Sequence, residues 1–187
     1  MKFDVILAGV GGQGVLSLAA IIATGAMRDN LKVRQSEVHG MSQRGGAVLS
    51  HLRISDSEIA SDLVAKGTAS LVLSMEPLEA LRYVDYLSPD GNIVTASEPF
   101  INIPDYPDTE TLYSKIRKFK KHKIVDSLAL AKEAGSSRAT NMVIIGAASS
   151  VLPVSLSSLK AAVEQLFSAK GKDVVDVNLR AFDLGAR

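Results

Sequence analysis

The feature that most restricts the fold is an apolar run that breaks into a glycine-rich turn and then into a helical pattern. Residues 5–8 form the run, and Gly9, Gly11, Gly12 and Gly14 follow directly. Apolar residues then recur at helical spacing, which predicts a buried helix face made of Val15, Leu18, Ala19, Ile22 and Ala26. This order can form an anion cradle, because the backbone can approach a ligand and the helix N-terminus offers unpaired N–H groups. The alternative is a tight connection that binds nothing.

Three of these glycines, Gly9, Gly11 and Gly14, satisfy the G-x-G-x-x-G pattern, and the strand and helix on either side are the context that this pattern needs. Gly11 is the position at which we expect a close approach to a ligand and a positive φ. Gln13 either donates its side-chain amide to the ligand or caps the first helical turn.

Short apolar strands alternate with helical patterns along the rest of the chain. The alternation predicts one α/β domain over residues 1–187, with an open, mostly parallel, Rossmann-like sheet, helices on both faces and a helical C-terminal third. The turn residues 56–58 and 89–91 separate strands, and the first of these turns leads into a short return strand around Ile59. The expected strands after the first are 32–35, 47–54, 70–74, 92–95 and 124–125.

Composition excludes several classes of function. The 187 residues contain 21 basic and 20 acidic residues, so net charge favours neither nucleic acid nor a membrane surface as a partner. No cysteine is present, which excludes disulfides, a thiol nucleophile and thiolate ligands for an iron–sulfur cluster. The histidines His39, His51 and His122 are too scattered for a metal motif. With no membrane span and no leader pattern, we expect a cytoplasmic protein without a covalently bound cofactor or metal.

A second glycine-rich segment, residues 36–46, follows the second predicted strand. Arg44 stands beside Gly45 and Gly46, and it can bind a phosphate or carboxylate through two hydrogen bonds or brace the loop or an interface. Ligands of open α/β sheets bind beyond the carboxyl ends of the strands. We therefore expect both glycine loops at that edge, on neighbouring strands.

Lysine and arginine dominate residues 115–123. The simpler interpretation is a solvated helix end that leads into the strand 124–125. The alternative is a patch for an acidic partner or a phosphate.

Taken together, the two motifs resemble the gamma-type subunit of 2-oxoacid:ferredoxin oxidoreductases, most closely the beta subunit of the indolepyruvate type. The resemblance rests on Gly9-x-Gly-Gly-Gln-Gly14, on Glu37-Val-His-Gly-Met-Ser-Gln-Arg-Gly-Gly46 and on Leu52-Arg-Ile-Ser55. It continues through Asn141-Met-Val-Ile-Ile-Gly146 and Leu152-Pro153, so it covers nearly the whole chain.

The resemblance implies a subunit that is inactive alone. Enzymes of this family oxidatively decarboxylate a 2-oxoacid with coenzyme A to an acyl-CoA and reduce ferredoxin. Thiamine diphosphate and the iron–sulfur clusters are then expected on a large partner subunit, through which ferredoxin is reduced, and the absence of cysteine here fits that division. Coenzyme A is a possible ligand of the glycine loops, whose candidate residues are Gly9, Gly11, Gly12, Gln13, Gly14, Glu37, Arg44, Gly45 and Gly46.

Two other functions stay open at this stage. Glu37 follows Gly14 at about the 20-residue offset of a ribose-binding acid, which would suit a free-standing NAD(P)-dependent dehydrogenase. A non-catalytic assembly module is the other. His39 can act as a proton donor near the substrate, although a loop-bracing or partner contact is the simpler role. The isolated chain is also a candidate homodimer.

Overall fold

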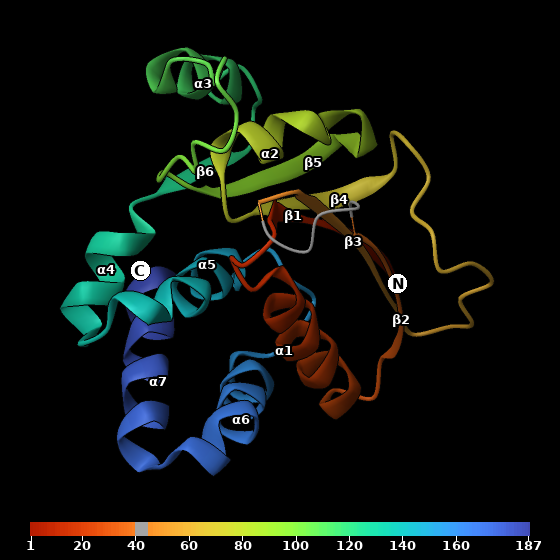
Figure 1. The fold of residues 1–187 in the computed structure, drawn as a ribbon. Helices are drawn as coiled ribbons and strands as arrows, with labels where there is room; N and C mark the ends of the chain where they lie inside the picture. The colour runs from red at the N-terminus through yellow and green to blue at the C-terminus, as the bar shows by residue number, and fades with distance from the viewer. Residues whose placement is uncertain (40–44) are drawn as a thin grey trace.

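A computed structural model describes residues 1–39 and 45–187 of the chain. The described part is built on a six-stranded sheet in the order β2-β3-β1-β4-β5-β6 (Figure 1). The strands are β1 (Lys2–Val10), β2 (Lys32–His39), β3 (Ala47–Ser55), β4 (Ala69–Ser74), β5 (Leu87–Ala96) and β6 (His122–Val125). Within this sheet β3 alone runs against the other strands, so the expected mostly parallel sheet is confirmed.

Helices cover both faces of the sheet, as expected from the alternating pattern (Figure 1). One face carries α2 (Pro77–Arg82) and α3 (Thr109–Ile116). The other carries α1 (Val15–Arg28) and α5 (Thr140–Ala148), with α4 (Ser127–Ala134) beside α5 and with α6 (Leu156–Phe167) and α7 (Lys172–Ala186) packed behind them. Short 3-10 turns span Val84–Tyr86, Ser137–Ala139 and Ser168–Lys170. None of the described helices is long and apolar enough to cross a membrane.

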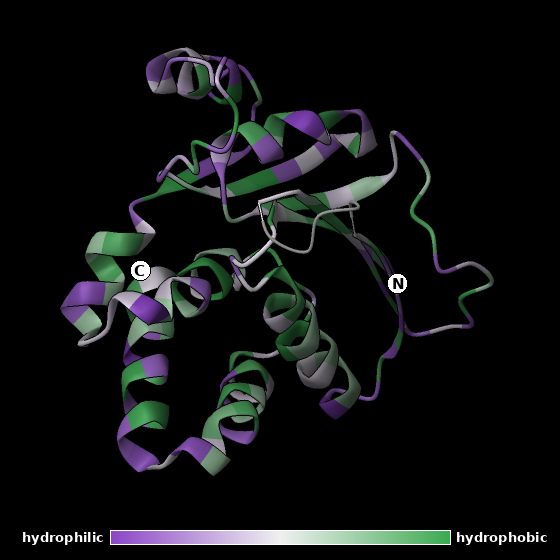
Figure 2. Ribbon diagram, in the orientation of Figure 1, coloured by the Kyte–Doolittle hydropathy of each residue, from purple (hydrophilic) through white to green (hydrophobic). Residues whose placement is uncertain are grey.

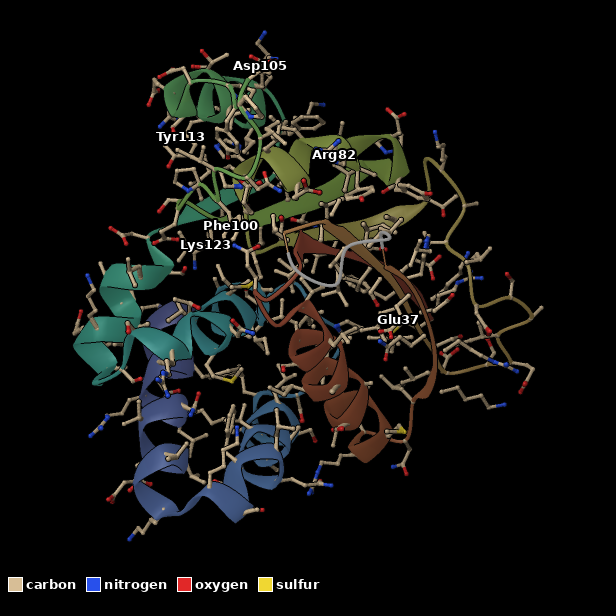
Figure 3. The ribbon with its side chains drawn as sticks, in the orientation of Figure 1. Glu37, Arg82, Phe100, Asp105, Tyr113 and Lys123 are labelled. Carbon is tan, nitrogen blue, oxygen red and sulfur yellow. The ribbon has the colours of Figure 1, made fainter. Side chains whose placement is uncertain are left out.

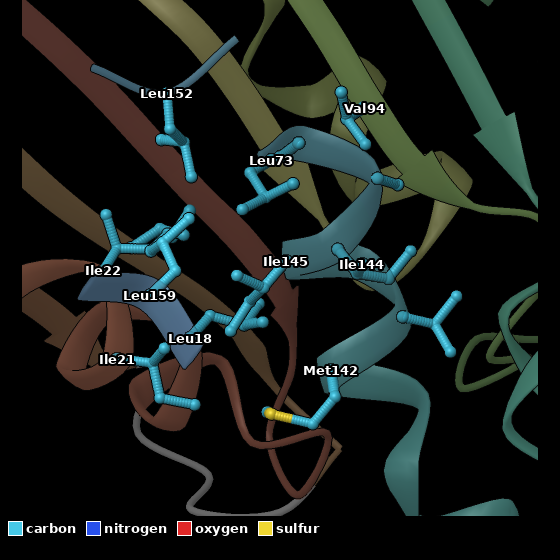
Figure 4. Packing of buried hydrophobic residues seen from close by; sticks show 14 of the residues in the cluster. Leu18, Ile21, Ile22, Leu73, Val94, Met142, Ile144, Ile145, Leu152 and Leu159 are labelled. Atoms are coloured by element: carbon cyan, nitrogen blue, oxygen red, sulfur yellow. The ribbon is translucent and has the colours of Figure 1, made fainter. Parts of the chain in front are cut away.

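The central strand β1 is buried on both sides, which explains its continuous apolar run. Val5 and Leu7 face the cluster under α1 and α5, whereas Ile6 faces the smaller cluster under α2. In the larger cluster, α1, α5 and the start of α6 interlock with the strands through Leu18, Ile21, Ile22, Leu73, Val94, Met142, Ile144, Ile145, Leu152 and Leu159 (Figure 4). α1 and α5 are mostly hydrophobic, and α7 alternates hydrophobic and hydrophilic residues (Figure 2).

Two glycines let α5 and α7 approach at backbone distance. A Cβ on Gly146 would lie 2.0 Å from the carbonyl oxygen of Phe182, and one on Gly185 would lie 2.0 Å from that of Val143. Neither helix can therefore carry a larger residue at these positions without moving, because protein interiors are closely packed.

Three expectations about local structure are wrong. β2 runs on to His39 instead of ending at residue 35, so Glu37 lies within a strand. Residues 89–91 belong to β5, where the register with β4 shifts, and they do not form a separate turn. Ile59 is buried but lies in an irregular segment that forms no strand.

The histidines outside the second loop have structural surroundings. Buried His51 accepts a hydrogen bond from the Val64 N–H on its Nδ1 atom (3.2 Å), and burial together with the nearby Arg53 charge lowers its pKa. His122 is exposed, and its Nδ1 lies 2.8 Å from the carbonyl oxygen of Phe119. Among residues 1–39 and 45–187, no group of histidine and acidic residues could hold a metal ion.

Candidate functional site

The parallel strands β1, β4, β5 and β6 end around one cavity of about 440 Å³, which we call the carboxyl-edge cavity. It is lined by Gly12, Gln13, Gly14, Met75, Glu98, Ser127, Leu128, Arg138, Thr140 and Asn141. The starts of α1, α4 and α5 all contribute to this lining. The cavity therefore lies where open α/β sheets bind ligands, beyond the carboxyl ends of their strands.

The first glycine turn leaves the start of α1 without a side-chain cap. Gly12 (φ +104°) and Gly14 (φ +76°) adopt conformations that suit glycine, and Gly14 caps α1 without a side-chain hydrogen bond. Within the part of the chain that the structure describes, the N–H groups of Gly12, Gly14, Val15 and Leu16 have no hydrogen-bond partner. These donors and the helix dipole favour an anion at this position.

Gly11 has a different role from the one expected. It is not among the glycines with positive φ, and its N–H donates to the carbonyl oxygen of Gly46 (2.8 Å). Its own carbonyl accepts a hydrogen bond from the Gly45 N–H (3.2 Å). Gly11 thus joins the two glycine loops, and its N–H is not available to a ligand.

Gly9 and Gln13 shape the turn from inside. A Cβ on Gly9 would lie 2.7 Å from Cγ2 of Val15, so only glycine fits between β1 and α1. The Gln13 side chain accepts from the Val10 N–H (2.8 Å) and donates to the Met75 carbonyl (3.3 Å). The Gln13 amide therefore braces the turn against the end of β4. This role is closer to the expected cap of the first helical turn than to a ligand contact.

The start of α5 faces the same cavity and adds positive charge. Asn141 donates its side-chain amide to the Gly14 carbonyl (3.0 Å), which fixes the glycine turn against α5. No side chain caps α5. The guanidinium of exposed Arg138 has neither an ion pair nor a hydrogen bond to the described residues. Arg138 is therefore placed to bind an anion that enters the cavity.

One carboxylate lies on the opposite wall. Glu98 accepts hydrogen bonds from the Ser127 hydroxyl (2.8 Å) and the Leu128 N–H (2.7 Å), so it occupies the start of α4. An anionic ligand is consequently favoured on the α1 and α5 side of the cavity and repelled from the α4 side.

The irregular segment 97–108, which also supplies Glu98, is fastened near the cavity. The buried Glu76 carboxylate accepts from the Phe100 N–H (3.4 Å) and from the Tyr106 hydroxyl, and burial together with this bond raises the pKa of Tyr106. Asn102 donates to the Gly45 carbonyl (2.7 Å), which ties the segment to the second glycine loop. Phe100 lies in this part of the molecule, away from Glu37 (Figure 3).

The second motif is described only in part. Gly45 (φ +77°) and Gly46 lead into β3 and contact the first turn, so the two loops do meet at the carboxyl edge. They meet because β3 is the neighbour of β1, whereas the strand that precedes the motif, β2, is not. His39 ends β2. The Arg44 hypothesis falls on residues 40–44, outside the described part of the chain.

Glu37 does not have the surroundings of a ribose-binding acid. It is exposed and pairs in register with Ser50 of β3, which separates it from β1 by one strand (Figure 3). In a dinucleotide-binding fold the first two strands are adjacent, with the acid beside the glycine turn. The intervening antiparallel strand argues against that geometry.

The residues that sequence reasoning missed are Glu98, Arg138 and Asn141. Glu98 follows the end of β5, and Arg138 and Asn141 lie around the start of α5, so the expected alternation of strands and helices contained a usable signal. In the sequence Asn141 opens the motif Asn141–Gly146, which carries part of the family resemblance, and Arg138 stands three positions before it.

Fold and site together define an open α/β domain with a cavity at the carboxyl edge of its sheet, lined by backbone N–H groups without a partner among the described residues and by Arg138. A family model described as pyruvate ferredoxin/flavodoxin oxidoreductase matches residues 4–187. The chain therefore belongs to the pyruvate ferredoxin/flavodoxin oxidoreductase family.

Relatives of similar length support this placement. Indolepyruvate oxidoreductase subunit IorB of Pyrococcus horikoshii is 36% identical, over 100% of this chain and 95% of the relative. IorB of Archaeoglobus fulgidus is 34% identical, over 99% of this chain and 94% of the relative. The chain is thus homologous to subunits of 2-oxoacid:ferredoxin oxidoreductases.

Solved structures have the same fold. The 2-oxoglutarate:ferredoxin oxidoreductase from Magnetococcus marinus, with 2-oxoglutarate, coenzyme A and succinyl-CoA bound, matches with a TM-score of 0.79 and 26% identity. That match covers 98% of this chain but 30% of the longer one. The gamma subunit of a keto/oxoacid ferredoxin oxidoreductase from Geobacter sulfurreducens matches with a TM-score of 0.70 and 24% identity, over 98% of this chain and 96% of that chain.

Proposed function

We propose that this chain is the clusterless subunit of an indolepyruvate or arylpyruvate ferredoxin oxidoreductase. The complex oxidatively decarboxylates the 2-oxoacid to an acyl-CoA and reduces ferredoxin. A large partner subunit supplies thiamine diphosphate and the iron–sulfur clusters, since the sequence has no cysteine to ligate a cluster. The IorB relatives, which match this chain along almost its whole length, support the indolepyruvate type.

The contribution of this subunit is a phosphate cradle for coenzyme A. The observation that carries this proposal is the carboxyl-edge cavity, where the start of α1, which no side chain caps, the start of α5 and Arg138 converge. Arg44 of the second loop is proposed to assist. A helix N-terminus contributes about 0.3–1 kcal/mol per anion, whereas millimolar affinity needs about 4 kcal/mol. The isolated chain should therefore bind coenzyme A weakly, and the assembled complex should bind it well.

The first test of this function is whether the chain is active without a partner subunit. The purified chain alone should carry no iron–sulfur chromophore and should not oxidise 2-oxoacids. Addition of the large partner subunit should restore reduction of ferredoxin or viologen with an aryl 2-oxoacid and coenzyme A. Turnover by this chain alone with NAD would instead establish a dehydrogenase, the alternative that the position of Glu37 already disfavours.

Arg44→Ala separates a ligand contact from an assembly role. If Arg44 contacts a phosphate, the substitution should raise the apparent KM for coenzyme A more than the KM for the 2-oxoacid, because no reacting group is lost. An unchanged KM for coenzyme A with weaker subunit association would assign Arg44 to the interface. Full activity after removal of the whole cradle would favour a pure assembly module.

A further inference from the structure

A second cavity, also of about 440 Å³, lies among the C-terminal helices, and we call it the C-terminal cavity. It is lined by Ser136, Arg138, Ala139, Phe167, Lys170, Asp173, Val174, Val177 and Asn178. Arg138 also lines the carboxyl-edge cavity, so the two cavities meet at this residue.

The inner lining of the C-terminal cavity is apolar and includes an aromatic ring. Ala139 is buried, and Phe167 and Val177 are partly buried against the main core. Apolar walls with one aromatic ring suit a flat group that removes apolar surface from water.

The rim of the cavity carries an excess of positive charge. Lys170 is exposed, and its ammonium lies 5.2 Å from the centre of the Phe167 ring. Among the described residues neither Lys170 nor Arg138 forms an ion pair. The carboxylate of the lining, Asp173, lies in the first turn of α7, where it complements the helix dipole. The two cations therefore outnumber the acid and leave the rim attractive to an anion.

These features together fit a nucleotide, whose heteroaromatic base is joined to a ribose that carries a phosphate. We propose that the C-terminal cavity holds the adenine ring and the ribose 3′-phosphate of coenzyme A, with Lys170 at the 3′-phosphate. The diphosphate then lies in the carboxyl-edge cavity between the start of α1 and Arg138, where the two cavities meet, and the pantetheine arm leads away from it. This inference rests on the proposed function, and it adds a base-binding site that the glycine motifs do not predict.

Dephospho-coenzyme A, which lacks only the 3′-phosphate, tests the inference in the reconstituted complex. Lys170→Ala should raise the apparent KM for coenzyme A about 10-fold and leave the KM for dephospho-coenzyme A unchanged, since a charge-assisted contact is lost with the first ligand only. Lys172→Ala is the matched control, because Lys172 is exposed nearby and does not line the cavity. It should alter neither constant.

A second variant tests the base-binding wall. Val177→Phe narrows the cavity, so it should raise the KM for both ligands by a similar factor. If Lys170→Ala shifts both constants equally, or shifts neither, the C-terminal cavity is not the site of the 3′-phosphate, although the proposed function stands. If the wild-type complex turns over without coenzyme A, the proposed function itself fails.

Discussion

Replacement of Gly14 by alanine should destabilise the chain measurably, because Gly14 is constrained in two ways. Its φ of +76° strains an L-residue by about 1–2 kcal/mol. A Cβ would also lie 2.5 Å from Nδ2 of Asn141, which donates to the Gly14 carbonyl. Loss of this hydrogen bond should cost about 0.5–1.5 kcal/mol of stability in addition. The free energy of unfolding should therefore fall by about 1.5–3.5 kcal/mol.

The matched control is Gly12→Ala, because Gly12 also has positive φ (+104°) but has nothing within 4 Å of its would-be Cβ. This substitution should lower the free energy of unfolding only by the cost of the positive φ, about 1–2 kcal/mol. Urea unfolding, followed by helical circular dichroism because the chain has no tryptophan, gives both values. In Gly14→Ala combined with Asn141→Ala, the costs should be sub-additive by about 0.5–1.5 kcal/mol. Equal costs at Gly12 and Gly14, or full additivity, would refute the close contact.

Three further predictions concern groups outside this turn. Glu98→Gln should weaken the start of α4 by about 0.3–1 kcal/mol in urea unfolding, yet tighten binding of coenzyme A to the complex, because a carboxylate leaves the cavity wall. Gly146→Ala should lower the unfolding free energy by about 3 kcal/mol or more, since its Cβ would meet the Phe182 carbonyl; a smaller loss would show that α5 and α7 can separate. Hydrogen bonds, foremost from Ser158, lower the pKa of Asp29, so its contribution to stability is present above the ordinary value of 3.8 and is lost as pH falls through the folded pKa. Asp29→Asn should therefore reduce the loss of stability on acidification in that window, as acid titration of the unfolding free energy would measure.

Periodic patterns in the sequence predicted those parts of the fold in which burial alone decides where apolar residues stand. The run at residues 5–8 is apolar on both sides because β1 lies in the middle of the sheet. The predicted face of α1 is buried because it packs against the sheet: Val15, Leu18, Ala19, Ile22 and Ala26.

Pairing between distant strands was not predictable in the same way. The sequence places β2 after α1, but nothing local reveals that β3 folds back between β2 and β1. For this reason Glu37 looked like a ribose-binding acid, whereas the structure puts it one strand away from β1. Arg138 was missed because its importance depends on cavities that helices distant in sequence form together.

The most direct test of the central claim is the affinity of the reconstituted complex for coenzyme A when Arg138 is replaced by glutamine. Loss of a charge-assisted phosphate contact should raise the Kd for coenzyme A by about 10-fold or more, as measured by calorimetric titration. The apparent KM for the 2-oxoacid should not change. An unaltered Kd for coenzyme A in an assembled, active complex would contradict the assignment of this cavity as the phosphate cradle.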